Sequence, residues 1–283
     1  MAMYLLLGAF GLALAFLLAG GMMRRSGVSG VLELPPPVDA GSKVRTWWVQ
    51  SLDVAGLIVM SLIFMGFGVS ALALGGEDQA DLSAGALVLN AAMFAIFVGA
   101  VWAIVRWRVR PTDWLGLRWS AWVHLLWFGP TIVLGMWLVM GLLQVAGYMA
   151  FMEEWLGTPS MQESVELLKE SKDSTVVALM ALSAAVVAPL AEEIIFRGYL
   201  YPVAKKWSGK VCAVVFSALW FSACHGNVPL ILPLFLLGVI LALAYEKTGS
   251  IWAPIGIHFF FNSATVLIQL AIRAGWISDQ VAS

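Results

Sequence analysis

The sequence predicts an all-α, polytopic membrane protein with about eight transmembrane helices. Of its 283 residues, 61% are hydrophobic and 12% are charged, and the mean hydropathy is +0.90. Soluble domains carry about 25% charged residues, so this composition excludes a soluble globular or disordered chain. Apolar runs of about twenty residues recur along the whole length and are continuously apolar rather than alternating, which indicates membrane helices and not barrel strands.

Eight apolar runs are interpreted as spans. In order, they are 4–23, 54–75, 85–105, 121–147, 176–203, 211–225, 228–245 and 250–271. The first lacks a basic segment in front of it, and Arg24 and Arg25 follow it, so it is interpreted as a membrane helix and not a secretion signal.

The spans divide the chain into three parts. Residues 1–150 hold four N-terminal transmembrane helices, with a Pro-rich linker at 31–42 that is expected in the cytoplasm. Residues 151–175 form an extracytoplasmic surface segment, in which Ser160 to Glu163 fits a capping box that begins a short helix. Residues 176–283 form the core, whose four helices are expected to carry the chemistry.

Basic residues predict the orientation of the chain. The loops after the first, third, fifth and seventh spans contain most of them: Arg24, Arg25, Lys43, Arg45, Arg106, Arg108, Arg110, Arg118, Lys205, Lys206, Lys210 and Lys247. Because short cytoplasmic loops carry the Lys and Arg excess, these loops are expected in the cytoplasm and both termini away from it.

Charge and cysteine content narrow the possible partners. The formal net charge is −1, which gives no basic footprint for a nucleic acid. Cys212 and Cys224 lie in apolar runs and are expected to be buried thiols, since a disulfide framework or zinc finger needs more cysteines. The composition predicts that the protein is surrounded by the lipid bilayer.

Ionisable residues gather inside the later spans. Three of them, Glu192, Glu193 and Arg197, lie within six positions of the fifth span. Glu193 and Arg197 are at i and i+4, so they share a helix face and can neutralise each other, whereas Glu192 points about 100° away. A charge at the bilayer centre costs about 2.5–3.5 kcal/mol, so an unpaired Glu192 indicates function.

Two further spans carry polar side chains at a similar depth. His225 lies in the sixth span, and His258 and Asn262 lie at i and i+4 in the eighth. A rise of about 1.5 Å per residue from the nearest loop lysine places Glu192, His225 and His258 about 20, 22 and 16 Å deep. A shared internal cavity is therefore expected.

These residues form three strings that resemble the motifs of the CPBP family of intramembrane proteases, which includes the type II CAAX prenyl endopeptidases. They are EExxxR from Glu192 to Arg197, FxxxH from Phe221 to His225, and HxxxN from His258 to Asn262. The resemblance covers about residues 175–272. It implies catalysis that depends on Glu192, the first glutamate of the motif.

The residues also suggest a mechanism. No G-x-S-x-G elbow and no H-E-x-x-H helix occurs in the sequence, so water is the expected nucleophile. Glu192 would take a proton from this water, His225 would hold or activate it, and His258 with Asn262 would donate to the oxyanion. Glu193 and Arg197 are expected to form a supporting ion pair.

The need for a metal stays open at this point. Glu192, His225 and His258 could bind a Zn²⁺ ion and leave one position for water, and the family is described both as metalloproteases and as glutamate-dependent proteases. The metal-free mechanism is preferred because the amide of Asn262 is a poor zinc ligand and a good oxyanion donor.

Three functions are compatible with these features. The preferred one is an intramembrane endopeptidase that cleaves a membrane-associated peptide or protein, lipidated or not. The first alternative is a non-catalytic membrane immunity or scaffold protein of the same fold. The second is a proton-coupled transporter, which is disfavoured because the polar groups converge at one depth and form no relay across the membrane.

Overall fold

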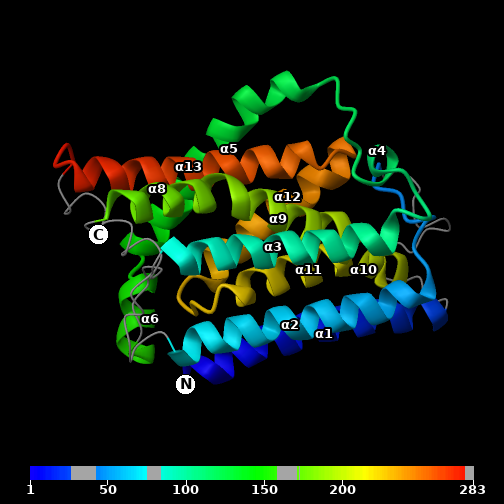
Figure 1. The fold of residues 1–283 in the computed structure, drawn as a ribbon. Helices are drawn as coiled ribbons and strands as arrows, with labels where there is room; N and C mark the ends of the chain where they lie inside the picture. Colours follow the sequence, from blue (N-terminus) through cyan, green and yellow to red (C-terminus); the bar gives the residue numbers. More distant parts are fainter. Residues whose placement is uncertain (27–42, 75–83, 158–170, 172, 278–283) are drawn as a thin grey trace.

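A computed structural model describes residues 1–26, 43–74, 84–157, 171 and 173–277 of the chain, and every regular element in these ranges is helical (Figure 1). The all-α prediction is therefore confirmed. The Pro-rich linker at 31–42 and the helix expected after Ser160 lie outside the described residues.

The elements follow the predicted spans closely. In the first half they are α1 (Ala2–Ser26), α2 (Ser51–Leu74), α3 (Ala84–Val105), α4 (Pro111–Trp114), the 3-10 turn η1 (Trp122–His124), α5 (Leu125–Val145) and α6 (Tyr148–Leu156). In the core they are α8 (Ser174–Leu182), η2 (Ser183–Val187), α9 (Ala188–Ile195), η3 (Phe196–Leu200), α10 (Tyr201–Ser208), α11 (Lys210–Cys224), α12 (Ile231–Thr248) and α13 (Trp252–Arg273).

The number of full spans differs from the prediction. Seven helices of the described part are long and apolar enough to cross a membrane, and one of them is the continuous helical stretch Ser174–Ser208. The sixth predicted span is α11, which has 15 residues and a length of about 22 Å, less than the hydrocarbon thickness of about 30 Å.

Helix α11 is the centre of the bundle. Eleven of its fifteen residues are buried, and it packs against α1, α2, α10 and α12. Figure 1 shows α1 and α2 on one side of the bundle and α13 with α5 on the other. Since α11 is enclosed by protein, it does not need to match the bilayer, and the non-helical backbone after Cys224 is tolerated where neighbouring helices cover it.

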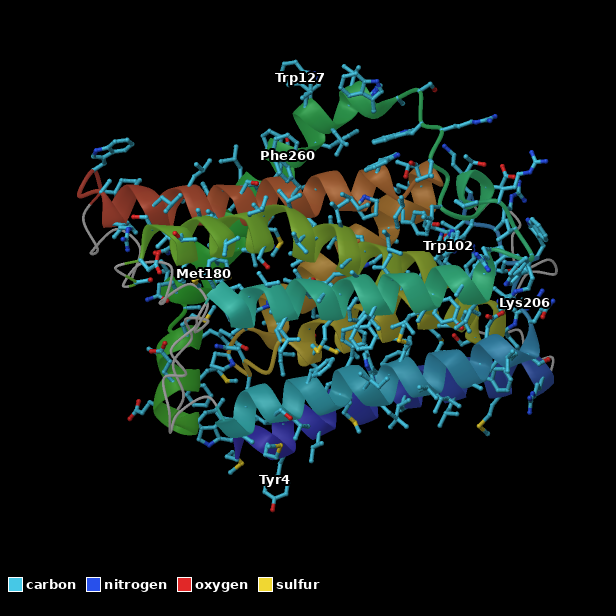
Figure 2. All side chains as sticks on the ribbon, in the orientation of Figure 1. Tyr4, Trp102, Trp127, Met180, Lys206 and Phe260 are labelled. Carbon is cyan, nitrogen blue, oxygen red and sulfur yellow. The ribbon has the colours of Figure 1, made fainter. Side chains whose placement is uncertain are left out.

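The outer surface consists of apolar side chains. Tyr4, Trp127 and Val145 expose 78%, 76% and 88% of their area, and Figure 2 shows Tyr4 and Trp127 pointing away from the bundle. Exposed apolar patches of this extent are not tolerated on soluble monomers, so this surface faces lipid. The chain is a multi-pass membrane protein.

Contacts bring the predicted cytoplasmic loops together at one end of the bundle (Figure 1). The guanidinium of Arg108 donates to both oxygens of Asp53 at 2.5 and 2.8 Å, which joins the end of α3 to the start of α2. This hydrogen bond raises the pKa of Arg108. In addition, Ile251 N–H donates to Leu115 O at 2.8 Å, which joins α4 to the turn before α13.

A buried ion pair holds the same end together. Lys205 Nζ donates to Glu246 Oε1 at 3.0 Å and to the Val44 carbonyl at 2.7 Å, and Tyr201 Oη donates to Glu246 Oε2 at 2.7 Å. The side chains of Lys205 and Glu246 are 0% and 1% exposed. The pair therefore connects α10, α12 and the segment before α2 without access to water.

Removal of one partner of this pair is expected to destabilise the protein strongly. Glu246→Ala leaves the Lys205 ammonium buried without its carboxylate, which should lower the free energy of unfolding by about 3–5 kcal/mol. Denaturant unfolding in detergent measures the change. The matched control is Lys247→Ala, which changes the exposed residue next to Glu246. Equal stability of the two variants would contradict the predicted role of the pair.

Candidate active site

The two glutamates lie on a helix that is interrupted on both sides by π-helical turns. Segment η2 precedes α9 and η3 follows it. In these segments Ala188 N–H donates to Ser183 O and Tyr201 N–H donates to Phe196 O, five residues back in each case. The apolar pattern of the sequence does not predict these turns, which are frequent at functional sites.

A proline lies two positions after the end of each π-helical turn. Pro189 and Pro202 have no N–H, so carbonyls in the preceding turn lack a main-chain donor. Side chains from other helices supply the missing bonds. Asn262 Nδ2 donates to Ala184 O at 2.8 Å, and Trp114 Nε1 donates to Gly198 O at 2.7 Å.

Glu193 lies at the centre of a buried polar network. Its Oε1 accepts from Arg197 Nη1 at 2.9 Å and from His258 Nδ1 at 2.9 Å, and the three side chains are 0%, 0% and 3% exposed. The predicted pair between Glu193 and Arg197 is therefore confirmed. The contact with His258 was not predicted, and it connects α9 to α13.

Arg197 extends the network to α11 and α12. Its Nη2 donates to Gly238 O at 3.1 Å, and its guanidinium carbon lies 4.5 Å from the ring centroid of Phe221. A Cβ on Gly238 would lie 2.9 Å from the Cα of Ala218, so only glycine lets α12 approach α11 this closely. The cation is thus fixed by a carboxylate, a carbonyl and an aromatic face.

Glu192 lies in a different environment from Glu193. Its side chain is 14% exposed, and its Oε2 is buried with no hydrogen-bond partner among the described residues. This oxygen lies 4.0 Å from His258 Nε2, which is too far for a direct hydrogen bond. Glu193 Oε1 is thus hydrogen-bonded to Arg197 and His258, whereas Glu192 Oε2 makes only the 4.0 Å contact with His258.

The network fixes the tautomers of both histidines. A carboxylate oxygen and a main-chain carbonyl only accept, so His258 Nδ1 donates to Glu193 and His225 Nδ1 donates to Phe221 O at 2.8 Å. In neutral histidine the other nitrogen, Nε2, is then an acceptor. His258 presents this nitrogen to Glu192.

Phe221 packs against both imidazoles. Its ring centroid is 4.8 Å from that of His225 and 5.7 Å from that of His258. His225 itself has no hydrogen bond or ion pair to either glutamate within the described ranges. The structure thus links Glu193, Arg197 and His258 directly and brings Glu192 to 4.0 Å from His258, while His225 packs against the Phe221 ring that also contacts His258.

The possible zinc ligands do not form a metal site in this arrangement. Among the residues that the structure describes, no three His, Cys, Asp or Glu side chains are grouped so that they could hold a metal ion. Glu192, His225 and His258 as arranged therefore do not fit a Zn²⁺ ion.

An apolar groove lies beside α9, and its volume is about 490 Å³. Its walls come from the start of α5 with the preceding loop, from η2 and α9, and from α13. The lining residues are Leu117, Trp119, Trp122, Leu125, Val186, Pro189, Leu190, Trp252, Ile255, Gly256 and Phe259. Its walls include none of the six candidate residues, although Phe259 is next to His258 in the chain.

Comparisons with known proteins agree with the motifs. Residues 174–264 match the family described as "Type II CAAX prenyl endopeptidase Rce1-like", and this segment includes all six candidate residues. A curated protein of Bacillus subtilis (strain 168), named "Putative membrane peptidase YdiL", is 29% identical over 104 residues, which are 37% of this chain and 43% of that protein. The matched part thus spans less than half of that relative. No solved structure matches the chain significantly.

Proposed function

Because residues 174–264 of this multi-pass membrane protein are an Rce1-like family segment, we propose that the protein is a membrane protease whose site is built around Glu192. One observation carries the proposal: a carboxylate oxygen buried in the bundle, without a hydrogen-bond partner in the described part, lies 4.0 Å from a histidine nitrogen. Such an oxygen is costly in a membrane protein unless it is used.

The separation of 4.0 Å suits a bridging water. Two hydrogen bonds of about 2.8 Å that meet at a right angle span this distance, so one water can bond Glu192 Oε2 and His258 Nε2 together. In the proposed reaction the water oxygen attacks the scissile carbonyl carbon, and the water proton passes to the Glu192 carboxylate. In the reacting state His258 Nε2 is proposed to carry a proton and donate to the water oxygen, so the water can donate one hydrogen to Glu192 and the other to the acceptor Nε2 of His225.

His258 and Asn262 are proposed to stabilise the oxyanion. A proton on His258 Nε2 converts this nitrogen from an acceptor into a donor that can bond the oxyanion. Asn262 uses one N–H on Ala184 O and keeps a second for the oxyanion. When the C–N bond breaks, the proton held by Glu192 passes to the leaving amine.

Glu193 and Arg197 are proposed to act through His258. The bond from His258 Nδ1 to Glu193 fixes the orientation of the imidazole. Arg197 in turn supplies a buried counter-charge beside the Glu193 carboxyl group. Neither residue needs to touch the substrate.

The substrate is proposed to be a membrane-associated peptide or protein that is reached from the basic end of the bundle. We place this end in the cytoplasm because the Lys- and Arg-rich loops meet there. Both termini would then lie on the opposite side of the membrane. A prenylated C-terminal peptide is the first substrate to test, since the matched family is described by that activity.

Cleavage by the purified full chain in detergent tests the function. A farnesylated CAAX peptide and its unlipidated form are incubated with wild type and with His225→Ala, and mass spectrometry identifies new termini. Wild type is expected to cleave, and His225→Ala should be slower by about 10²-fold because the water is no longer held. Equal rates for wild type and variant, or no cleavage of either peptide together with no peptide bound by Glu192→Gln, would contradict the proposal.

A further inference from the structure

The π-helical turn η2 before α9 leaves one main-chain carbonyl without a main-chain donor, and a side chain of α13 donates to it. Within η2 each N–H donates to the carbonyl five residues before it, as Ala188 N–H does to Ser183 O. The donor expected for Ala184 O is therefore the N–H of residue 189. Residue 189 is proline and has no N–H. The side chain of Asn262 donates to this carbonyl instead, at 2.8 Å.

This bond is one of two that fix α13 against the helix that carries the glutamates. Asn262 and His258 lie four residues apart on one face of α13, and they contact Ala184 O and Glu193 Oε1, respectively. Contacts at two points determine both the rotation and the axial position of a helix. Loss of the Asn262 anchor would therefore displace His258 relative to both glutamates.

We propose that Pro189 is a positioning residue: by leaving Ala184 O free for Asn262, it anchors α13 so that His258 meets Glu193 and faces Glu192. This inference rests on the proposed protease function only for its effect on the reaction. The anchor itself is a property of the fold. Pro189→Ala would supply an N–H that competes with Asn262 for the carbonyl.

The chain contains a matched control for this substitution. Pro202 follows η3 at the same spacing as Pro189 follows η2. Near it Trp114 Nε1 donates at 2.7 Å to Gly198 O, which lies four residues before Pro202, whereas Ala184 O lies five residues before Pro189. Trp114 lies on α4, which carries no candidate catalytic residue. Pro202→Ala therefore restores a main-chain N–H after a π-helical turn, as Pro189→Ala does, without touching the link between α9 and α13.

The first measurement detects the environment of the His258 ring by NMR and needs no substrate. The chain has three histidines, His124, His225 and His258, so nitrogen NMR of ¹⁵N-histidine protein gives few ring signals, and His258→Gln assigns those of His258. Pro189→Ala is expected to shift the His258 Nδ1–H signal or to exchange-broaden it, whereas Pro202→Ala leaves it in place. Asn262→Ala removes the donor of the same hydrogen bond and should shift the same signal. This variant replaces Pro189→Ala in the test if Pro189→Ala does not fold.

The second measurement compares kcat and KM for peptide cleavage among the same variants. Pro189→Ala is expected to lower kcat by about 10–100-fold with KM unchanged, because a small displacement of His258 affects the reaction and not the binding of the peptide. Pro202→Ala should keep the wild-type kcat. In the double variant Pro189→Ala with Asn262→Ala, kcat should equal that of Asn262→Ala alone, since both changes break one contact.

The outcomes separate the two proposals. An unmoved His258 signal in Pro189→Ala, or equal losses of kcat in Pro189→Ala and Pro202→Ala, would overturn the positioning role. If the signal moves but wild type cleaves nothing, the anchor is supported and the protease function fails.

Discussion

Glu192→Gln is expected to lower kcat for peptide cleavage by about 10²–10⁴-fold while the protein stays folded. The amide has the same shape as the carboxyl group but cannot take a proton from water. Because Glu192 Oε2 has no hydrogen-bond partner in the described part of the chain, the substitution breaks no bond of the fold. Substrate should still bind, so KM should change much less than kcat.

The matched control for this substitution is Glu154→Gln. Glu154 is an exposed glutamate of α6, far along the chain from the candidate residues. Cleavage rates and thermal unfolding in the same detergent compare wild type with both variants. Full activity of Glu192→Gln would exclude the carboxylate as base, and equal losses in the two variants would show that the charge change alone reduces activity.

Arg197→Met is expected to produce the largest loss of stability. It leaves Glu193 as a buried carboxylate without its cation, and it removes the bond to Gly238 O and the contact with the Phe221 ring. Loss of one partner of a fully buried pair costs about 3–5 kcal/mol, which is a large part of the stability of a typical domain.

A second substitution distinguishes lost charge balance from lost packing. Glu193→Gln in the Arg197→Met background removes the uncompensated charge, so the double variant should be more stable than Arg197→Met alone. It should nevertheless stay inactive, because the carboxylate that orients His258 is absent. Unfolding in detergent gives the stability, and Arg110→Met at an exposed position is the control. A double variant that is less stable than Arg197→Met would contradict this electrostatic account.

The sequence predicts the membrane helices well because their signal is local. Runs of apolar residues alone place the first four spans within a few residues of α1, α2, α3 and α5. The i and i+4 spacing likewise predicts the pair between Glu193 and Arg197, since α9 and η3 keep these residues on one face. Both predictions depend only on residues close to each other in the chain.

Features that depend on tertiary contacts were not predicted. Nothing in the apolar pattern of 176–203 indicates that π-helical turns lie on both sides of α9, although Pro189 and Pro202 are a signal that could have been used. The bond from His258 to Glu193 joins residues 65 positions apart, and the bond from Asn262 to Ala184 O involves a main-chain carbonyl that has no sequence signature. The short length of α11 follows from its enclosure by other helices.

A structure of the Glu192→Gln variant with an uncleaved peptide tests the central claim most directly. The account predicts the scissile carbonyl carbon about 3–3.5 Å from a water that contacts residue 192 and a histidine Nε2, with the carbonyl oxygen toward His258 and the free N–H of Asn262. A scissile bond bound elsewhere, for example in the apolar groove with Phe259 and Trp122, would contradict it.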